Sequence, residues 1–393
     1  MPSASRSRVI GDPVSAYVVG ASKTRFGPSS YSLPQLAQQA MVDALIDAAL
    51  RPTELKAFIV ANFLGGPNES QLHLNAVIAG LMPGVRLPGW RVEAACASGG
   101  VAVHQAVRLL GTYDPILVIG IERLSGLPGT ELTRNIGMAG DVILDQSQGL
   151  NFPATYALVA QRHMQRYGTR IRDFELISLK SHDNSTKNPK AHFHHKKVTQ
   201  ADIDAGATVA SPLRLFDCCP VSDGAAAVII SSRPVDSRSV PIVGSAVCSD
   251  VISLAQRDDC TTFPAAREAA SSAYAEAGIG ASDIDLAEVH DCFTIAEIVA
   301  MEDLGLARPG AAVELVRAGE TGIGGSIPVN PSGGLKAGGH AIGATGVAQI
   351  YEAVTQLRHE AGERQVARAE HAVTHNVGGV GGTCAVHVLR RPS

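Results

Sequence analysis

The sequence is poor in several residue types that whole classes of protein depend on. Aromatic residues make up only 4% of the 393 residues, which disfavours stacking platforms for bases or sugars. Lys and Arg (33) do not outnumber Asp and Glu (37), so the chain lacks the basic footprint of a nucleic-acid-binding protein. No apolar run approaches the roughly 20 residues of a membrane span. We therefore expect a protein that binds neither nucleic acid nor membrane.

Cysteine is also scarce, and its spacing does not suit a metal site. The seven cysteines include the adjacent pair Cys218 and Cys219, but no C-x-x-C pair of the kind that zinc sites use. An odd number of cysteines without a secretory signal is typical of reduced, intracellular thiols. The N-terminal segment has no long apolar stretch, and the final residues RRPS are not a peroxisomal tripeptide. We expect a cytoplasmic protein without a bound metal.

Apolar residues, by contrast, reach 45% against 18% charged, enough for a substantial core. Short apolar runs predict strands at 16–19, 57–60, 116–121, 226–230, 286–289 and 384–389. Apolar residues are nearly continuous in these runs, which indicates strands buried on both faces of a helix-covered sheet. Residues 103–110 carry apolar side chains at the spacing of one helix face, with Gly111 as a stop. These patterns predict an α/β fold.

Two segments look like copies of one unit. Residues 33–63 and 264–293 each comprise an Ala-rich helix, a turn, a strand and a final Phe. Each is followed by a turn of small residues that opens a helix, at 96–100 and at 338–346. A duplicated unit would bring the two turns together about a pseudo-twofold axis, although any two α/β units share such a pattern. We expect an N-terminal half (1–122), an insertion that returns to this half (123–240) and a C-terminal half (241–393).

Cys96 is the first candidate for chemistry. It lies among small residues in the segment VEAACASGG, directly before the predicted helix. A thiol at a helix N-terminus faces the positive end of the helix dipole and free N–H groups, both of which favour the thiolate. A buried structural cysteine is the alternative interpretation.

Two further segments carry histidines that could act with this thiol. His340 lies in residues 330–346, whose six glycines imply a backbone that comes close to a ligand. It could take a proton from a thiol, or it could be a turn histidine bonded to backbone. His290 and Cys292 belong to the tetrapeptide HDCF after a predicted strand, where α/β proteins often place site residues; core packing is the alternative. A second cysteine would suit a Claisen condensation, which also needs donors for two oxyanions.

Two other segments are more ambiguous. The loop HNVGGVGG, which contains Gly378, could supply backbone N–H groups to an oxyanion or could be a tight connection. It is not a dinucleotide fingerprint, because too few residues follow it to form the helix and strand. A basic stretch could meet the phosphates of a CoA-like ligand, form a metal site with His182, or be a solvated loop; it comprises His192, His194, His195, Lys196 and Lys197.

Together these segments resemble the thiolase family over nearly the whole chain. The resemblance rests on the Cys96 segment, DCCPVSDGAAA (217–227), HDCF, residues 330–346 and the last Gly-rich loop, in the family's order. It implies two similar α/β halves in a layered αβαβα core, with an inserted loop domain over the CoA site. It also implies acyl-CoA substrates, coenzyme A as cosubstrate without a permanently bound cofactor, and a homodimer or tetramer.

The resemblance also assigns roles to residues. Cys96 corresponds to the acylated nucleophile and His340 to its base. His290 corresponds to the residue that helps to bind the thioester oxygen, with a water or His340 as the other donor. The N–H groups of Cys96 and Gly378 would form a second oxyanion hole.

Three positions depart from the common family pattern. Many thiolases have an acid/base cysteine where this chain has Asn376, and Asn-Glu-x-Phe where it has HDCF. The combination is closer to sterol-carrier-protein-type and archaeal-type thiolases. This resemblance implies that Cys292 takes the acid/base role. Cys384 lies within the last predicted strand and is expected in the core. Ala341 replaces the proline usual after the histidine, so this loop is expected to be less rigid.

The leading hypothesis is thus a thiolase of the acetyl-CoA acyltransferase type, which forms or cleaves 3-ketoacyl-CoA through an acyl-Cys96 intermediate. The alternatives are a ketosynthase-like or specialised acyltransferase of the same superfamily, and a non-catalytic thiolase-like subunit. Relatives of the archaeal type also suggest a small zinc-ribbon/OB-fold protein as a partner.

Overall fold

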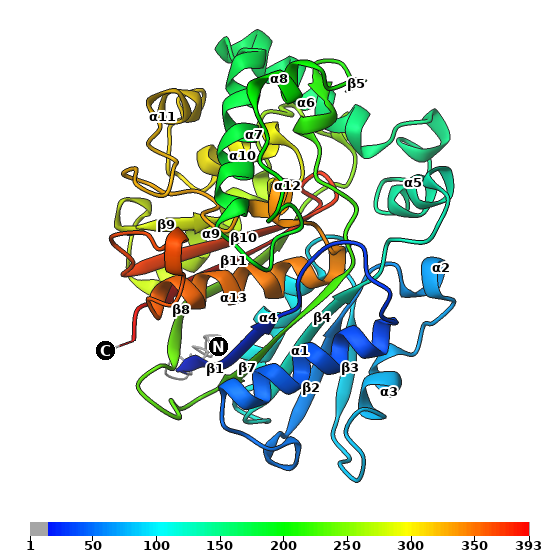
Figure 1. Ribbon diagram of the computed structural model, residues 1–393, viewed down its shortest axis with the longest axis vertical. Helices are drawn as coiled ribbons and strands as arrows, with labels where there is room; N and C mark the ends of the chain where they lie inside the picture. Colours follow the sequence, from blue (N-terminus) through cyan, green and yellow to red (C-terminus); the bar gives the residue numbers. More distant parts are fainter. Residues whose placement is uncertain (1–14, 393) are drawn as a thin grey trace, which may run out of the picture.

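A computed structural model describes residues 15–392 and centres on one large mixed sheet (Figure 1). The sheet has nine strands in the order β3-β2-β4-β7-β1-β8-β11-β10-β9. Their bounds are β1 Ala16–Lys23, β2 Ala57–Ala61, β3 Gly89–Val92, β4 Ile116–Glu122, β7 Gly224–Ser231, β8 Val240–Ser249, β9 Leu286–Glu288, β10 His371–Gly378 and β11 Thr383–Arg390. The short strands β5 (Thr208–Ala210) and β6 (Leu213–Arg214) form a separate pair.

Thirteen helices surround the sheet within the described part of the chain. They are α1 Leu33–Asp47, α2 Gly65–Glu69, α3 Leu74–Ala79, α4 Ser98–Leu109, α5 Gly129–Gly137, α6 Phe152–Tyr167, α7 Ile171–Thr186, α8 Gln200–Asp204, α9 Pro264–Ala277, α10 Thr294–Asp303, α11 Ala312–Ala318, α12 Gly334–Gly338 and α13 Thr345–Leu357. Between residues 15 and 392, no helix combines the length and the apolar character needed to cross a membrane. The expectations about the chain's extreme ends concern residues 1–14 and 393, which lie outside the described range.

The sheet consists of two halves of the same topology. Outward from the junction, the first half runs β1-β7-β4-β2 and the second β8-β11-β10-β9, with β3 added only to the first. In the first half, β4 pairs antiparallel with β7 and parallel with β2. In the second half, β10 likewise pairs antiparallel with β11 and parallel with β9. A short antiparallel pairing of residues 16–18 with 240–242 joins the halves. The duplication predicted from residues 33–63 and 264–293 is confirmed as α1–β2 and α9–β9.

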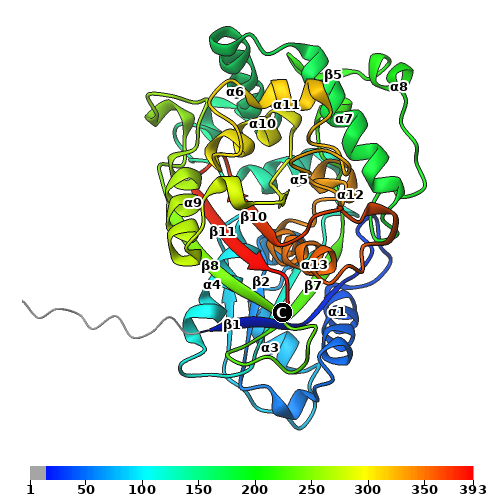
Figure 2. The same ribbon diagram turned by 90° about the vertical axis from the view of Figure 1, so that its left-hand side faces the viewer.

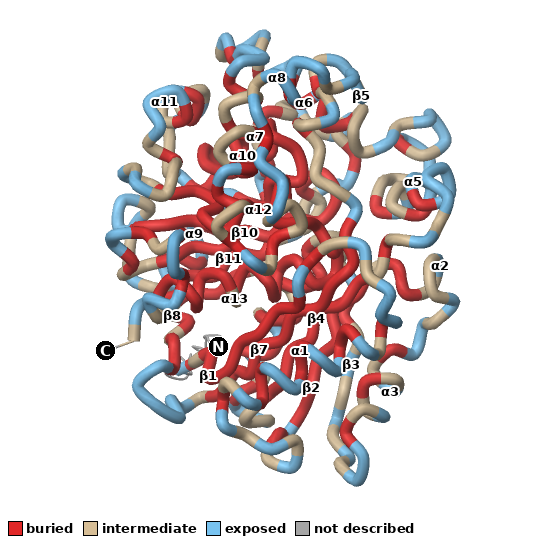
Figure 3. The backbone as a smooth tube through the Cα atoms, viewed as in Figure 1, coloured by how far each residue is buried: buried red, intermediate tan, exposed pale blue. Residues whose placement is uncertain are grey.

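The helices form layers around these halves. Helix α1 packs on the first half and α9 on the second, while α4 and α13 lie between the halves and contact strands of both (Figure 2). A Cβ atom on Gly346 would lie 2.1 Å from the backbone nitrogen of Gly100, so only glycine allows this approach. The two turns of small residues therefore meet, as the duplication predicts. Figure 3 shows that the sheet and the middle helices are buried, whereas α5 and α8 are exposed in large part.

The six predicted strands are all present, within β1, β2, β4, β7, β9 and β11. The sequence patterns do not predict β3, β8 and β10. Strand β10 is buried yet carries the polar run Thr374-His375-Asn376, and β8 is interrupted by Pro241 and Gly244. Gly244 is required by packing, because a Cβ atom there would lie 2.1 Å from the carbonyl oxygen of Ala273 in α9.

Residues between β4 and β7 form most of the upper part of Figure 1, above the sheet ends where the predicted site residues lie. This segment contains α5 to α8, β5 and β6, and it returns to the sheet through β7, which pairs with β4 and β1. Helix α6 packs against α10 of the second half. The segment thereby spans from one half to the other at the top of the sheet.

A buried cluster of charges lies at the junction of the two halves. Lys23 of β1 and Arg364 pair with opposite oxygens of Glu352, at 3.2 and 2.9 Å. Glu288, at the end of β9, accepts hydrogen bonds from the backbone N–H and the hydroxyl of Ser332 at 3.1 and 2.6 Å. Burial, together with the negative charge of Glu352, raises the pKa of Glu288 to about 8.

The raised pKa of Glu288 makes the stability of the fold fall as pH rises from mildly acidic to about 8. Its stabilising contribution is present at low pH, where the carboxyl is protonated, and is lost as pH rises through the folded-state pKa of about 8. In the Glu288→Gln variant, the neutral amide can keep both bonds to Ser332. We expect the wild type to lose up to about 1.4 kcal/mol per pH unit relative to the variant between about pH 5 and pH 8. Urea unfolding of both proteins across this range measures the difference, and parallel curves would contradict the prediction.

Candidate active site

Cys96 lies in the turn between β3 and α4. Ala95 has a φ of +50°, a left-handed conformation that turns the chain sharply before the cysteine. Ser98 stabilises this turn, since its hydroxyl accepts from the N–H of Ala94 at 2.9 Å and donates to the carbonyl of Ala95 at 2.6 Å. The thiol of Cys96 consequently faces a cavity of about 280 Å³ at the start of α4.

The environment of Cys96 favours the thiol over the thiolate. Burial raises its pKa to about 12; hydrogen bonds from the N–H groups of Gly379 and of Cys96 itself lower it, and the carboxylate of Glu122 raises it. Backbone N–H groups thus lower the pKa of Cys96, in the direction expected from the sequence, but burial outweighs them and the thiol is the resting form. Any reaction that uses Cys96 as a nucleophile would therefore need a base to remove its proton.

His340 is held in an orientation that would suit such a base. The hydroxyl of Thr345 donates to the carbonyl of Ala341 at 3.0 Å, which leaves its oxygen to accept from Nδ1–H of His340 at 2.7 Å. The ring therefore has its lone pair on Nε2. Burial lowers the pKa of His340 to about 3, so the ring is neutral before reaction. One ligating atom from each of Cys96, His290 and His340 forms a group whose members all lie within 4.8 Å of one another.

His290 and Cys292 lie at the same site, as the HDCF motif predicts. The ring of His290 is nearly perpendicular to that of His340, with centroids 5.1 Å apart. Burial lowers the pKa of His290 well below its ordinary value, with smaller contributions from His340 and His375. Cys292 lines the cavity with Cys96, and burial, then Cys219 and Cys96, raises its pKa well above the ordinary value. All four predicted residues thus meet, each in its uncharged form.

The segment DCCPVS joins the two halves of the site. The N–H of Cys219 donates to the carbonyl of Cys292 at 2.9 Å, and Val221 forms a bridge with His340. Ser222 accepts from the backbone N–H of His340 at 3.3 Å and also contacts Nδ1 of His192 at 2.9 Å. His192 therefore supports the His340 loop, whereas the basic stretch is exposed at 195–197.

The predicted oxyanion loop reaches the nucleophile. Gly378 packs so closely that a Cβ atom there would lie 2.5 Å from the carbonyl oxygen of Ala94. Its neighbour Gly379, another glycine of the same predicted loop, directs its N–H to the sulfur of Cys96. A Gly-rich run does not indicate which of its N–H groups points at a ligand, because that depends on the turn geometry.

Glu122 is a further site residue that the sequence reasoning missed. Its carboxylate accepts from the N–H groups of Phe63, Leu64 and Gly343, each at 2.9 to 3.0 Å, and so ties the first half to the His340 loop. Burial raises its pKa to about 7 against these hydrogen bonds. Its sequence signal is a single acidic residue at the end of the apolar run 116–121, which indicates a buried acid with backbone partners.

The cavity beside Cys96 is largely apolar. The inserted segment contributes the rings of Phe152 and Tyr156 to its wall, and Tyr156 stacks on Phe293 at 4.7 Å between centroids. Val209, Leu215 and Val221 also line it and are 44 to 56% exposed, so they mark its opening to solvent. Such a cavity fits an acyl chain or the slender arm of a thioester carrier with the reacting carbonyl at Cys96.

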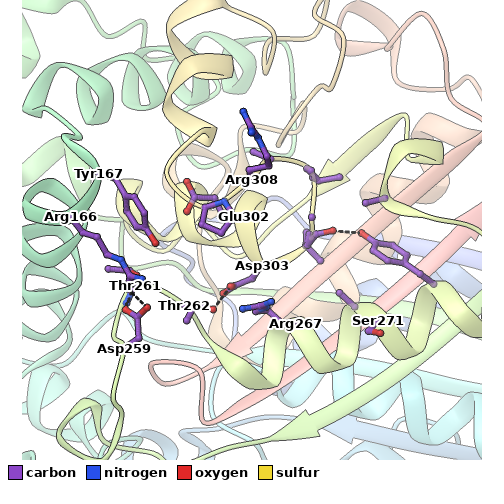
Figure 4. A pocket seen from close by; sticks show the side chains of 18 residues that line it. Arg166, Tyr167, Asp259, Thr261, Thr262, Arg267, Ser271, Glu302, Asp303 and Arg308 are labelled. Atoms are coloured by element: carbon purple, nitrogen blue, oxygen red, sulfur yellow. Dashed lines mark hydrogen bonds and ion pairs between the residues drawn. The ribbon is translucent and has the colours of Figure 1, made fainter.

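A larger cavity of about 770 Å³ lies elsewhere and contains none of the predicted site residues (Figure 4). Asp303 lies at its inner side and accepts from the Thr262 hydroxyl and the Phe263 N–H; Arg267 and Arg308 at its rim are exposed. Arg166 pairs with Asp259 there. Its charged groups are thus partly paired with one another, and it holds no nucleophile.

Comparisons with known proteins agree with this geometry. A model of the thiolase N-terminal domain matches residues 16–234, and a thiolase C-terminal domain-like model matches residues 246–391. The chain is 43% identical over 384 residues to an acetyl-CoA acetyltransferase of Methanothermobacter thermautotrophicus, covering 95% of this chain and 99% of that protein. It is 33% identical over 398 residues to human sterol carrier protein 2, covering 95% and 71%. A solved structure named "Ltp2-ChsH2(DUF35) aldolase" superposes with a TM-score of 0.83 and 25% identity, covering 97% and 98%.

The Thr345 hydroxyl can be tested as the group that keeps the lone pair of His340 on Nε2. In Thr345→Val, Nδ1 loses its acceptor and the ring can rotate or change tautomer, so we expect acetylation of Cys96 by acetyl-CoA to slow about tenfold to a hundredfold. Rapid-quench mass spectrometry measures this rate. Thr355→Val is a matched control, because Thr355 lies in the same helix and also donates to the carbonyl four residues earlier, at 2.8 Å. Equal rates in both variants would contradict the assignment.

Proposed function

This chain belongs to the thiolase family, and on that premise we propose that it transfers acyl groups through Cys96, with His340, His290 and Cys292 as its reacting partners. It is an acyltransferase with the thiolase fold. The observation that carries the residue assignment is the close group of Cys96, His290 and His340, all within 4.8 Å at an apolar cavity.

In the first step, Nε2 of His340 takes the proton of Cys96 as sulfur attacks the carbonyl carbon of an acyl-CoA. The N–H groups of Cys96 and Gly378, with Gly379 beside the sulfur, stabilise the negative oxygen that develops. The C–S bond to CoA then breaks, and the leaving thiolate takes the proton from His340. Because Cys96 and His340 are both uncharged at rest, charge appears in the site only during the reaction.

In the second step, Cys292 moves the proton at the α-carbon. For condensation, Cys292 first gives its proton to Nε2 of His340, and its thiolate removes the α-proton of a second acyl-CoA. The enolate carbon then attacks the acyl carbon on Cys96 and releases the Cys96 thiolate, which takes the proton from His340. For cleavage by CoA, Cys96 gives its proton to His340 and attacks the 3-keto carbon, the C–C bond breaks, and Cys292 gives a proton to the α-carbon. His340 then returns its proton to Cys292, and CoA takes the acyl group from Cys96 by the reverse of the first step. His290 donates to the thioester oxygen in both directions. The raised pKa of Cys292 supplies the thiol form that cleavage needs at rest.

The assembly and setting of the enzyme are a second part of the proposal. Strand β3 is one of the two outer strands of the sheet, and its Trp90 is 37% exposed, which supports a homodimer paired along this edge or a tetramer of such dimers. The name of the solved neighbour, which includes a DUF35 component, supports a small zinc-ribbon/OB-fold protein as a further partner. We also propose coenzyme A as cosubstrate and a cytoplasmic location.

The assignment of the two cysteines is tested by cleavage of acetoacetyl-CoA with added CoA. We expect Cys96→Ala to lose at least about 10³-fold in kcat/KM, because the acyl carrier is gone. Cys292→Ala should lose about 10²- to 10⁴-fold, the usual contribution of a proton-transfer group. Cys248→Ala serves as control, since this cysteine lies in β8 outside the cavity. Undiminished turnover in either site variant would refute its role.

Mass spectrometry after mixing with acetyl-CoA separates the two roles. The wild type and Cys292→Ala should both gain an acetyl group on Cys96, whereas Cys96→Ala should not. A wild type that gains no adduct would support the non-catalytic subunit instead. Turnover that depends on a malonyl thioester would indicate a ketosynthase.

A further inference from the structure

Asn376 lies where it contacts both halves of the catalytic group. It is 1% exposed near the end of β10. Its Oδ1 accepts from the backbone N–H of Gly100 at 3.0 Å, and its Nδ2 donates to the backbone carbonyl of Cys96 at 2.9 Å. The same Nδ2 lies 3.2 Å from Nδ1 of His290.

The backbone fixes which way the Asn376 amide faces. Rotating it by 180° would place its NH₂ against the N–H of Gly100 and its oxygen against the carbonyl of Cys96, losing both bonds and adding two repulsions. The group that faces His290 is therefore a donor. A neutral imidazole that accepts at Nδ1 must have its proton on Nε2.

The remaining contacts of His290 agree with this tautomer. Among the described residues, Nε2 of His290 has no hydrogen-bond partner although it is buried. A buried N–H without a partner is costly unless a ligand accepts from it. His340 is held in the opposite tautomer, because the Thr345 hydroxyl accepts a hydrogen bond from its Nδ1–H and leaves the lone pair on Nε2.

We propose that Asn376 is a positioning residue that keeps His290 in the Nε2–H tautomer, so that one histidine of the site donates where the other accepts. The role of the donated N–H in holding a thioester oxygen rests on the function proposed above. The tautomer itself does not, since it follows from the contacts of Asn376 alone.

The same contacts have a consequence for metal binding. Cys96, His290 and His340 lie close enough to hold one ion and have the sulfur and nitrogen ligands that zinc prefers. A ring nitrogen binds a metal only through its lone pair, and Asn376 places a proton on Nε2 of His290. Asn376 thereby disfavours a zinc ion that would block the nucleophile.

The variant Asn376→Asp should reverse both properties. A carboxylate only accepts hydrogen bonds, so it would accept one from Nδ1–H of His290, which leaves the lone pair on Nε2. It would keep the bond from Gly100 and lose the bond to Cys96. Asn75→Asp is a matched control, because the Asn75 amide also donates to a backbone carbonyl, that of Gly89 at 3.1 Å, in α3 outside the cavity.

The first readout is ¹⁵N NMR of histidine-labelled protein, with His290 assigned by the signals lost in His290→Gln. We expect a pyridine-like Nδ1 for His290 in the wild type and in Asn75→Asp, and a protonated Nδ1 in Asn376→Asp. A protonated Nδ1 in the wild type would overturn the proposal. This result stands even if the variant does not fold, and it does not depend on activity.

The second readout is titration with ZnCl₂ alone. We expect Asn376→Asp to bind zinc at least about tenfold more tightly than the wild type and Asn75→Asp, with protection of Cys96 from alkylation. Equal affinity in all three proteins would count against the proposal.

The third readout separates the steps of catalysis. Loss of one oxyanion donor should lower kcat for acetoacetyl-CoA cleavage about 10²- to 10³-fold in Asn376→Asp, while acetylation of Cys96 slows by less than about tenfold. An equal loss in both steps would indicate a merely structural role for Asn376. If the wild type shows neither cleavage nor acetylation, the proposed function fails, yet the NMR and zinc results still decide the tautomer.

Discussion

The site depends on the close approach of two helix N-termini at the pseudo-twofold axis. Helices α4 and α13 meet at Gly99, Gly100 and Gly346, where a Cβ atom on Gly346 would lie 2.1 Å from a backbone nitrogen. The turns that precede these helices carry Cys96 and His340, so the backbone contact sets how near the thiol and the ring come. The two turns occupy equivalent positions in the duplicated fold, but one carries a cysteine and the other a histidine. In the proposed mechanism, one turn supplies the nucleophile and the other supplies its base.

Desolvation decides the electrostatics of this pair. The N–H groups of Gly379 and of Cys96 itself stabilise a thiolate at Cys96, yet burial outweighs them, and the pKa of the thiol is raised to about 12. Burial also lowers the pKa of His340 to about 3, so neither group is charged at rest. An isolated charge would be costly in this site, and in the proposed mechanism the proton moves only when the substrate brings an oxygen that can take up negative charge. The apolar cavity walls that the inserted segment contributes are therefore part of what sets these pKa values in the proposed mechanism.

The sequence predicts the parts of the structure that depend on apolar patterns and on recurring motifs. The six continuous apolar runs become strands, and Cys96, His290, Cys292 and His340 meet as expected. It does not predict β10, because His375 and Asn376 interrupt its pattern and their partners come from other elements. It also does not predict the protonation state of Cys96. Both failures concern polar groups in the core, whose energies are set by residues far apart in the chain.

Ala341 shows how such distant contacts can replace a local restraint. The proline expected after the histidine would fix φ near −65°, and Ala341 has a φ of −83° without that ring. Its carbonyl accepts from Thr345, and two positions on, the N–H of Gly343 donates to Glu122 of the other half at 2.9 Å. These bonds hold the loop at both ends, and the residue itself is fully buried. The expected loss of rigidity is therefore offset by tertiary contacts that also orient His340, so the loop and the base are held by the same groups.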